Sequence, residues 1–153
     1  MFLFEQSLEM NLAVVSMGPP SSDADWTAYL QALDEMNRTA AVTARPVLAQ
    51  VMRSPSVPSA TVRRAIGAFR ERIRPDVINV VISDSITVRH VQTALDWLHK
   101  PHYDSTVHAT SESGLAHVER LLGPSGWAER GPTLRRLVAA IERRMGQPQP
   151  ERR

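Results

Sequence analysis

Hydrophobic positions along this chain follow two spacings that alternate with each other. Short runs of apolar and β-branched residues predict strands, whereas longer stretches with apolar residues three or four positions apart predict helices. The predicted strands cover residues 2–7, 10–17, 45–52, 77–83 and 106–109. The run VINVVIS at 77–83 is the clearest, and its near-continuous apolar character is typical of a central strand covered on both faces.

The stretches with helical spacing lie between and after these strands. The predicted helices cover residues 21–39, 60–73, 87–98, 111–122 and 133–146. Serines at positions typical of helix N-caps precede three of them: Ser21 or Ser22, Ser59, and Ser85 beside Asp84. In the helix at 87–98 the apolar residues Val88, Val91, Leu95 and Leu98 form one stripe, which we expect to face the core.

The order of these elements favours an α/β fold. Strands that alternate with helices predict a single mixed, mostly parallel sheet of four or five strands covered by helices, with an added C-terminal helix. Leu8 and Glu9 form a tight turn in this scheme, so the first two strands make a hairpin. We expect an α/β domain over residues 1–123, a linker over 124–132, an amphipathic helix over 133–146 and a disordered tail over 147–153.

Three segments carry a resemblance to a known group of proteins. They are the opening strand pair followed by a helix with Trp26 and Tyr29, the strand and helix VINVVISDSITVRHVQTALDWL, and the strand Thr106–Ala109 followed by SESGLAHVERLLG. Together with the element order they resemble the small bacterial SpoIIAA-like and STAS domains over roughly residues 2–122. The resemblance implies a non-enzymatic regulatory or scaffolding module that acts through protein–protein contact.

One motif of that group is missing. Its anti-sigma-factor antagonists carry an Asp-Ser-x-Gly phosphorylation motif at the helix after the third strand. This chain has RSPSVPSAT at residues 53–61, which contains serines but neither the Asp-Ser pair nor the glycine. Asp84-Ser85 occurs one strand–helix unit later, so the resemblance does not carry a phosphoserine switch over to this chain.

Composition narrows the function classes. The 153 residues are 42% hydrophobic and 22% charged, with a net charge of +2, and they include no cysteine. The lack of thiols excludes disulfide scaffolds, thiolate metal sites and cysteine nucleophiles. No apolar run is long enough to span a bilayer and the start lacks a basic secretory segment, so we expect a cytoplasmic protein. The mild net charge makes nucleic acid an improbable partner.

The carboxyl ends of the central strands are the first candidate site. Parallel sheets bind ligands at this edge, beside helix N-termini that attract anions. Serines and arginines that follow two neighbouring strands are the candidates for anion binding or phosphorylation: Arg53, Ser54, Ser56, Ser59, Ser85 and Arg89. The alternative is that the serines only cap helices and that residues 53–59 form a proline-rich connector.

The last helix is the second candidate. An apolar stripe and a basic face lie along it, and the residues proposed for contact are Leu134, Arg135, Leu137, Val138, Ile141 and Arg144. This helix either packs back on its own domain or offers its apolar stripe to a partner helix groove or a second subunit.

Other chemistry has little support in the sequence. The five histidines lack metal-ligand spacing, and the chain has neither a nucleophile elbow nor a glycine-rich nucleotide loop. We therefore expect no catalytic residue, metal or cofactor. The leading hypothesis is a module that binds a protein of unknown identity, with a homodimer as one form of it. The alternatives are a small ligand-binding or enzymatic domain around Ser85, and nucleic-acid binding through Arg63, Arg70 and Arg74 on one helix face.

Overall fold

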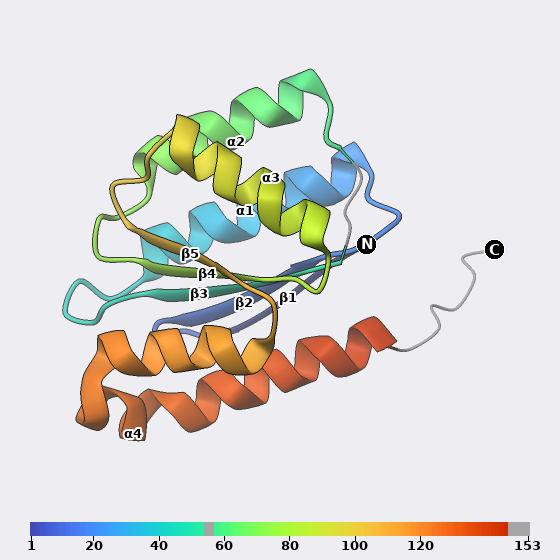
Figure 1. Ribbon diagram of the computed structural model, residues 1–153. Helices are drawn as coiled ribbons and strands as arrows, with labels where there is room; N and C mark the ends of the chain where they lie inside the picture. Colours follow the sequence, from blue (N-terminus) through green and yellow to red (C-terminus); the bar gives the residue numbers. More distant parts are fainter. Residues whose placement is uncertain (54–56, 147–153) are drawn as a thin grey trace.

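The computed structural model describes residues 1–53 and 57–146, and these form an α/β fold with a single mixed sheet (Figure 1). The elements in chain order are β1 (Phe2–Ser7), β2 (Leu12–Met17), α1 (Asp23–Thr39), β3 (Val47–Met52), α2 (Ala60–Arg72), β4 (Ile78–Ile82), α3 (Ile86–Leu98), β5 (Asp104–His108) and α4 (Ser111–Gly146). The expected strands and the helices up to α3 are confirmed to within a few residues. The expected tail at 147–153 lies outside the described residues.

The five strands follow each other in space in the order β1-β2-β3-β4-β5. β1 and β2 form the expected antiparallel hairpin, and β2 to β5 are parallel. Leu48 lies opposite Asn79, and Asn79 lies opposite Ser105 in the adjoining pair of strands. The carboxyl ends of β2 to β5 therefore share one edge of the sheet.

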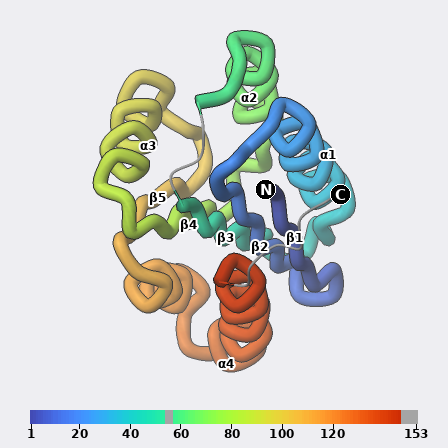
Figure 2. Tube along the Cα trace, turned by 90° about the vertical axis from the view of Figure 1, so that its right-hand side faces the viewer, coloured from blue at the N-terminus to red at the C-terminus, as the bar shows by residue number. Residues whose placement is uncertain are grey.

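Helices cover both faces of the sheet, as Figure 2 shows end on. α1, α2 and α3 lie over one face, and both halves of α4 lie over the other. Each layer has its own apolar core: strand residues such as Val80 and Ile78 pack on Leu134, Ile141 and other residues of α4, while Trp26 of α1 belongs to the core on the opposite face.

Serine N-caps start three helices, as the sequence predicts. The Ser22 hydroxyl accepts a hydrogen bond from the Asp25 amide, and the Asp25 carboxylate accepts one from the Ser22 amide, which makes a capping box. Ser59 and Ser85 cap α2 and α3 in the same way, at 3.3 Å from the amides of Val62 and Val88. Local sequence thus fixes where these helices begin.

The expected linker at 124–132 is wrong, because these residues are helical. The only break inside α4 is at Gly123, whose φ of 73° lies in the left-handed region that glycine adopts readily. Pro124 follows directly, at the first position of a helix, where the missing amide proton costs nothing. Glycine and proline therefore turn the chain between two helical halves here and do not form an extended connector.

Candidate functional site

Of the predicted anion-binding residues that the structure describes, Ser85 and Arg89 lie at the carboxyl end of β4, and their polar groups already have partners. Ser85 caps α3, and its amide donates to the hydroxyl of buried Ser83 over 3.2 Å. The Arg89 guanidinium donates to the carbonyl oxygens of Ser83 at 2.7 Å and Asp84 at 3.0 Å. These bonds support the capping interpretation of Ser85, and they use part of the donor capacity that an anion would need.

The neighbouring loop adds little to this edge. Ser59 caps α2, and Arg53 is exposed, with its backbone amide donating to the Met17 carbonyl oxygen over 3.3 Å. Ser54 and Ser56 lie outside the described residues. The described part of the loop therefore supplies a helix cap and one exposed arginine.

The C-terminal helix packs on its own sheet, which is the first of the two alternatives for it. Leu134, Val138 and Ile141 are buried among the strands, and Leu137 is partly buried beside them. On the polar side, the Arg135 guanidinium lies 5.2 Å from the Trp127 ring centre, and Arg144 pairs with Glu5 of β1 at 2.6 Å. The apolar stripe is thus covered by this chain itself.

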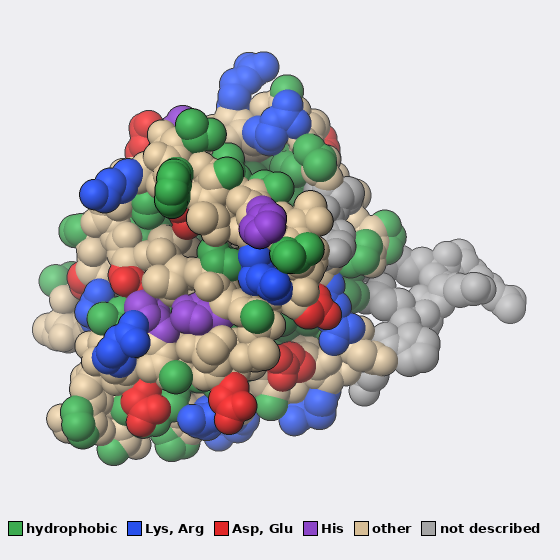
Figure 3. All heavy atoms as spheres, in the orientation of Figure 1, with side chains coloured by type: hydrophobic (Ala, Val, Ile, Leu, Met, Phe, Trp, Pro, Cys, Tyr) green, Lys and Arg blue, Asp and Glu red, His purple; other side chains and the backbone are tan. Residues whose placement is uncertain are grey.

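α3 has the opposite orientation, and the expected inward stripe is wrong for three of its four residues. Val88 is partly buried, but Val91, Leu95 and Leu98 are exposed, together with Ile86 and Trp97. Their exposed fractions are 59% for Ile86, 55% for Val91, 40% for Leu95, 86% for Trp97 and 75% for Leu98. Figure 3 shows hydrophobic and uncharged side chains over much of this helix. We call these five residues the α3 apolar face.

The inward side of α3 is polar instead. Asp96 pairs with Arg70 of α2 and accepts hydrogen bonds from the Gln92 amide and from the hydroxyl of Ser105 on β5, both at 3.1 Å. Arg89 is held against the carbonyl oxygens at the start of the helix. The two formally charged residues of α3 therefore both bond within this chain.

A row of polar side chains in the sheet explains that orientation. Buried Gln50 of β3 donates to buried Asn79 of β4 at 2.5 Å, and Asn79 donates to Ser105 at 3.2 Å. The hydroxyl of buried Tyr29 donates to the other end of the row at Gln50, and burial raises the pKa of Tyr29 so that it keeps its proton. The row ends at Ser105, whose hydroxyl donates to the Asp96 carboxylate, so this face offers α3 a polar group that a leucine could not bond. Sequence reasoning missed the row, although an asparagine inside VINVVIS was its visible sign.

A second polar cluster lies between β5 and the first half of α4. The His117 ring bonds to the Asp104 carboxylate at 2.8 Å and to the Arg120 guanidinium at 2.7 Å. The His108 ring lies 5.5 Å from that of His117, and desolvation, His117 and Arg120 lower the pKa of His108. Within the described residues no group of histidines and carboxylates is placed to hold a metal ion.

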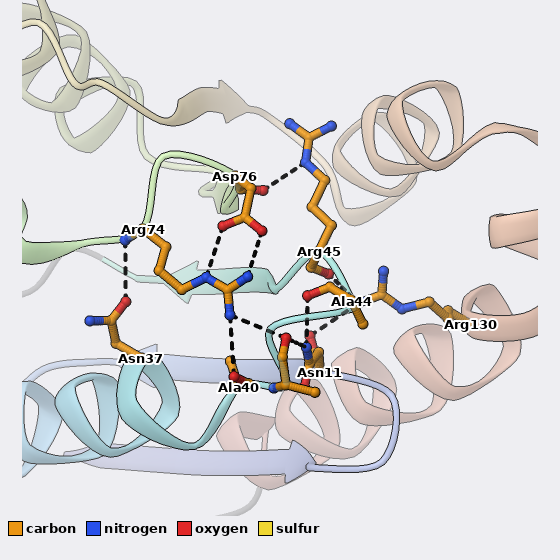
Figure 4. A network of polar contacts seen from close by, with 9 residues as sticks. Asn11, Asn37, Ala40, Ala44, Arg45, Arg74, Asp76 and Arg130 are labelled. Carbon is orange, nitrogen blue, oxygen red and sulfur yellow. Dashed lines mark hydrogen bonds and ion pairs between the residues drawn. The ribbon is translucent and has the colours of Figure 1, made fainter.

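The opposite edge of the sheet is closed by a structural network (Figure 4). Buried Arg130 of α4 donates to the carbonyl oxygens of Met10, Asn11 and Arg45, and so ties α4 to the β1–β2 turn and to the start of β3. Arg74 bonds to both carboxylate oxygens of Asp76, at 2.9 and 2.6 Å. Since Arg74 pairs with Asp76 and Arg70 with Asp96, two of the three arginines considered for nucleic-acid binding are engaged within the chain.

An open groove of about 350 Å³ lies between α1 and α2. Its walls mix apolar side chains such as Leu30 and Phe69 with polar ones, and Asp34 lies 3.8 Å from Arg72 across it. The groove is separate from both candidate sites of the sequence and has no cluster of groups suited to catalysis among its lining residues.

Comparison with known proteins identifies no relative. No family model, no curated protein and no solved structure matches the chain. Among the described residues, no helix is long and apolar enough to cross a membrane. Of the eight large hydrophobic side chains that are exposed among the described residues, five belong to the α3 apolar face.

Proposed function

We propose that this chain is a non-enzymatic cytoplasmic module, regulatory or scaffolding in role, that works by binding protein through the α3 apolar face. The observation that supports the proposal is the exposure of Ile86, Val91, Leu95, Trp97 and Leu98 on one helix. A group of exposed large apolar side chains on one helix is typical of a surface that contacts another macromolecule. The resemblance to SpoIIAA-like domains, which act through protein contact, points in the same direction.

The make-up of the face supports a protein partner. Interface cores are depleted of charged residues and enriched in aromatic anchors. Both formally charged residues of α3 bond within their own chain, and Trp97 is the most exposed of the large apolar side chains on α3. A ligand-binding function at the Ser85 edge has less support, because Ser85 and Arg89 there already bond to the backbone.

Site-specific photocrosslinking tests the proposal. A photoreactive amino acid replaces Trp97 in one variant and Ala68, an exposed residue of α2, in a matched control. After irradiation in the native cytoplasm, we expect a protein adduct that is specific to position 97. The adduct partner, identified by mass spectrometry and purified, should bind the wild-type chain and lose binding to Leu95→Glu. Identical adduct patterns at positions 97 and 68 would overturn the proposed function.

A further inference from the structure

We propose that the protein bound at the α3 apolar face is a second copy of this chain, joined to the first across a two-fold axis by α3 and by the free edge of β5. This inference rests on the proposed function and adds the identity of the partner. It starts from three properties of the surface: its lack of charge, its self-complementary ends and its continuity with an edge strand.

The outer side of α3 lacks the formally charged side chains that usually favour exposure of a helix surface to solvent. Between Ile86 and Leu98 the formally charged residues are Arg89 and Asp96, and both bond within the chain. The remaining exposed positions of α3 are Thr87, His90, Thr93 and Ala94, of which all but the imidazole of His90 are small. Small residues between larger apolar ones let a second helix approach closely, because the distance between helix axes depends on the side chains at the contact.

The two ends of α3 complement each other. Asp84 stands just before the helix, and His99 and Lys100 stand just after it, all of them exposed. A two-fold axis perpendicular to α3 reverses the helix direction, so the two α3 helices then run antiparallel. The acidic start of one helix then lies beside the basic end of the other, and the helix dipoles oppose each other favourably. A second copy is therefore a partner whose charge pattern already fits.

α3 alone is small for a stable interface, and the adjoining edge of the sheet extends it. A helix of 13 residues is about 20 Å long and about 10 Å wide. Stable complexes bury roughly 800 Å² on each partner. β5 is an edge strand that pairs with β4 on one side, and Figure 2 places it along the same side of the molecule as α3. Exposed edges of this kind are templates for pairing with another strand.

A single two-fold axis can relate both β5 and α3 to their counterparts in the second copy. A two-fold axis perpendicular to the sheet makes two β5 strands antiparallel and keeps both α3 helices on the same face of the joined sheet. With the axis near Thr106, the middle residue of β5, Asp104 of one copy lies opposite His108 of the other. Within each chain Asp104 already bonds to His117 and His108 to Thr106, so the joined edge contributes backbone hydrogen bonds between the strands rather than a new ion pair.

The cysteine-free sequence gives a direct test. A single cysteine introduced by Ala94→Cys lies near the middle of α3 and close to the proposed axis, whereas Ala68→Cys is an exposed control on α2. Under mild oxidation we expect Ala94→Cys to form a disulfide-linked dimer much faster than Ala68→Cys. Equal rates for the two variants would contradict the proposed axis.

Sedimentation equilibrium of the full chain measures the association itself. We expect a species of twice the 17.0 kDa chain mass at submillimolar concentration. The double substitution Leu95→Glu and Leu98→Glu should weaken the dimer by at least about a hundredfold, because it puts unpaired charges in the interface. Ala68→Glu should leave it unchanged. Both positions are exposed, so circular dichroism should show an intact fold in every variant.

The remaining outcomes separate this inference from the proposed function. A chain that stays monomeric overturns the dimer. If that monomer still forms a specific adduct with a different polypeptide through position 97, the proposed function stands. If it instead floats with vesicles of phosphatidylcholine and phosphatidylglycerol, and Leu95→Glu abolishes flotation, the α3 apolar face is a membrane-binding surface and both proposals fail.

Discussion

α3 and α4 are both amphipathic helices on the same sheet, but they turn opposite sides towards it. α4 buries Leu134, Val138 and Ile141 and, apart from buried Arg130, keeps the arginines of its second half exposed. α3 directs Asp96 inwards and leaves Leu98 exposed. The helix with the more apolar sequence is therefore the one with its apolar residues in solvent.

The two faces of the sheet account for this difference. The residues of β3 and β4 that pack on the apolar stripe of α4 are apolar: Val47, Ala49, Val51, Ile78, Val80 and Ile82. The face beneath α3 carries Gln50, Asn79 and Ser105. Gln50 and Asn79 bond to Tyr29, to each other and to Ser105, and α3 extends the row through the bond from Ser105 to Asp96. A polar helix side therefore suits this face better than an apolar one. The sheet thus decides which side of an amphipathic helix is buried.

Alanine substitutions in the two helices should give the largest contrast. Ile141→Ala removes a side chain that is fully buried and should lower the free energy of unfolding by about 2–5 kcal/mol. Leu98→Ala removes one that is 75% exposed and should lower it by less than about 0.5 kcal/mol. Urea denaturation at low protein concentration, where association contributes least, measures both. Equal losses would contradict the outward orientation of α3.

Removing the inward carboxylate should have the next largest effect. Asp96→Ala leaves Arg70 and Ser105 without their partner and should destabilise the fold by about 1–3 kcal/mol. Asp34→Ala is the matched control, because Asp34 pairs with exposed Arg38 and Arg72 and should cost less than about 1 kcal/mol. Hydrogen exchange should also quicken in α3 for Asp96→Ala alone. Unchanged exchange there would mean that the polar side does not hold the helix.

The sequence predicts much of the fold because its signals are local. Serines at 22, 59 and 85 start helices where expected, and the β-branched run of β4 forms a fully buried strand inside the sheet, between β3 and β5. The prediction of a linker at 124–132 was wrong because the effect of proline and glycine on a helix depends on their position in it. Pro124 stands at the first turn of a helix, where proline is tolerated, and Gly123 supplies the turn before it.

The candidate site was harder to predict because it depends on contacts between distant residues. Periodicity identifies α3 as amphipathic, but the same pattern fits either side facing the sheet. The orientation depends on a row of polar residues from three strands: Gln50 of β3, Asn79 of β4 and Ser105 of β5. These residues are far apart in the chain, and they meet the polar side of α3, which includes Gln92, only in the folded structure. Gln50 and Asn79, each inside an otherwise apolar strand, were the local signs that this face is polar.

Glycine substitutions sharpen the contrast between the two helical layers. A Cβ at Gly114 of α4 would lie 2.9 Å from Cγ1 of Val80 and 3.1 Å from Cγ1 of Ile82 on β4. Gly114→Ala should therefore destabilise the fold by about 1–3 kcal/mol. A Cβ at exposed Gly67 of α2 meets no atom within 4 Å, so Gly67→Ala should stabilise by about 0.5–1 kcal/mol. Calorimetric melting temperatures should shift in opposite directions, and a shared direction would show that α4 does not approach β4 so closely.

The smallest expected effect concerns pH and the layer beneath α4. Desolvation, with the nearby charges of His117 and Arg120, lowers the pKa of His108 from its ordinary 6.5, while Asp104 opposes this. The folded chain then binds fewer protons than the unfolded chain just below pH 6.5, so His108 makes the fold less stable as the pH falls through that range. Urea denaturation on either side of pH 6.5, in the Leu95→Glu and Leu98→Glu background, should show this loss.

His108→Gln should flatten that pH dependence, since glutamine does not titrate. Arg120→Gln should flatten it in part, because the removal of a neighbouring cation lets the pKa of His108 rise towards its ordinary value. An unchanged slope in His108→Gln would mean that other groups carry the pH dependence. A reduced slope in both variants would place this titration between β5 and α4, away from the polar row that orients α3, and so separate the electrostatics of the two faces of the sheet.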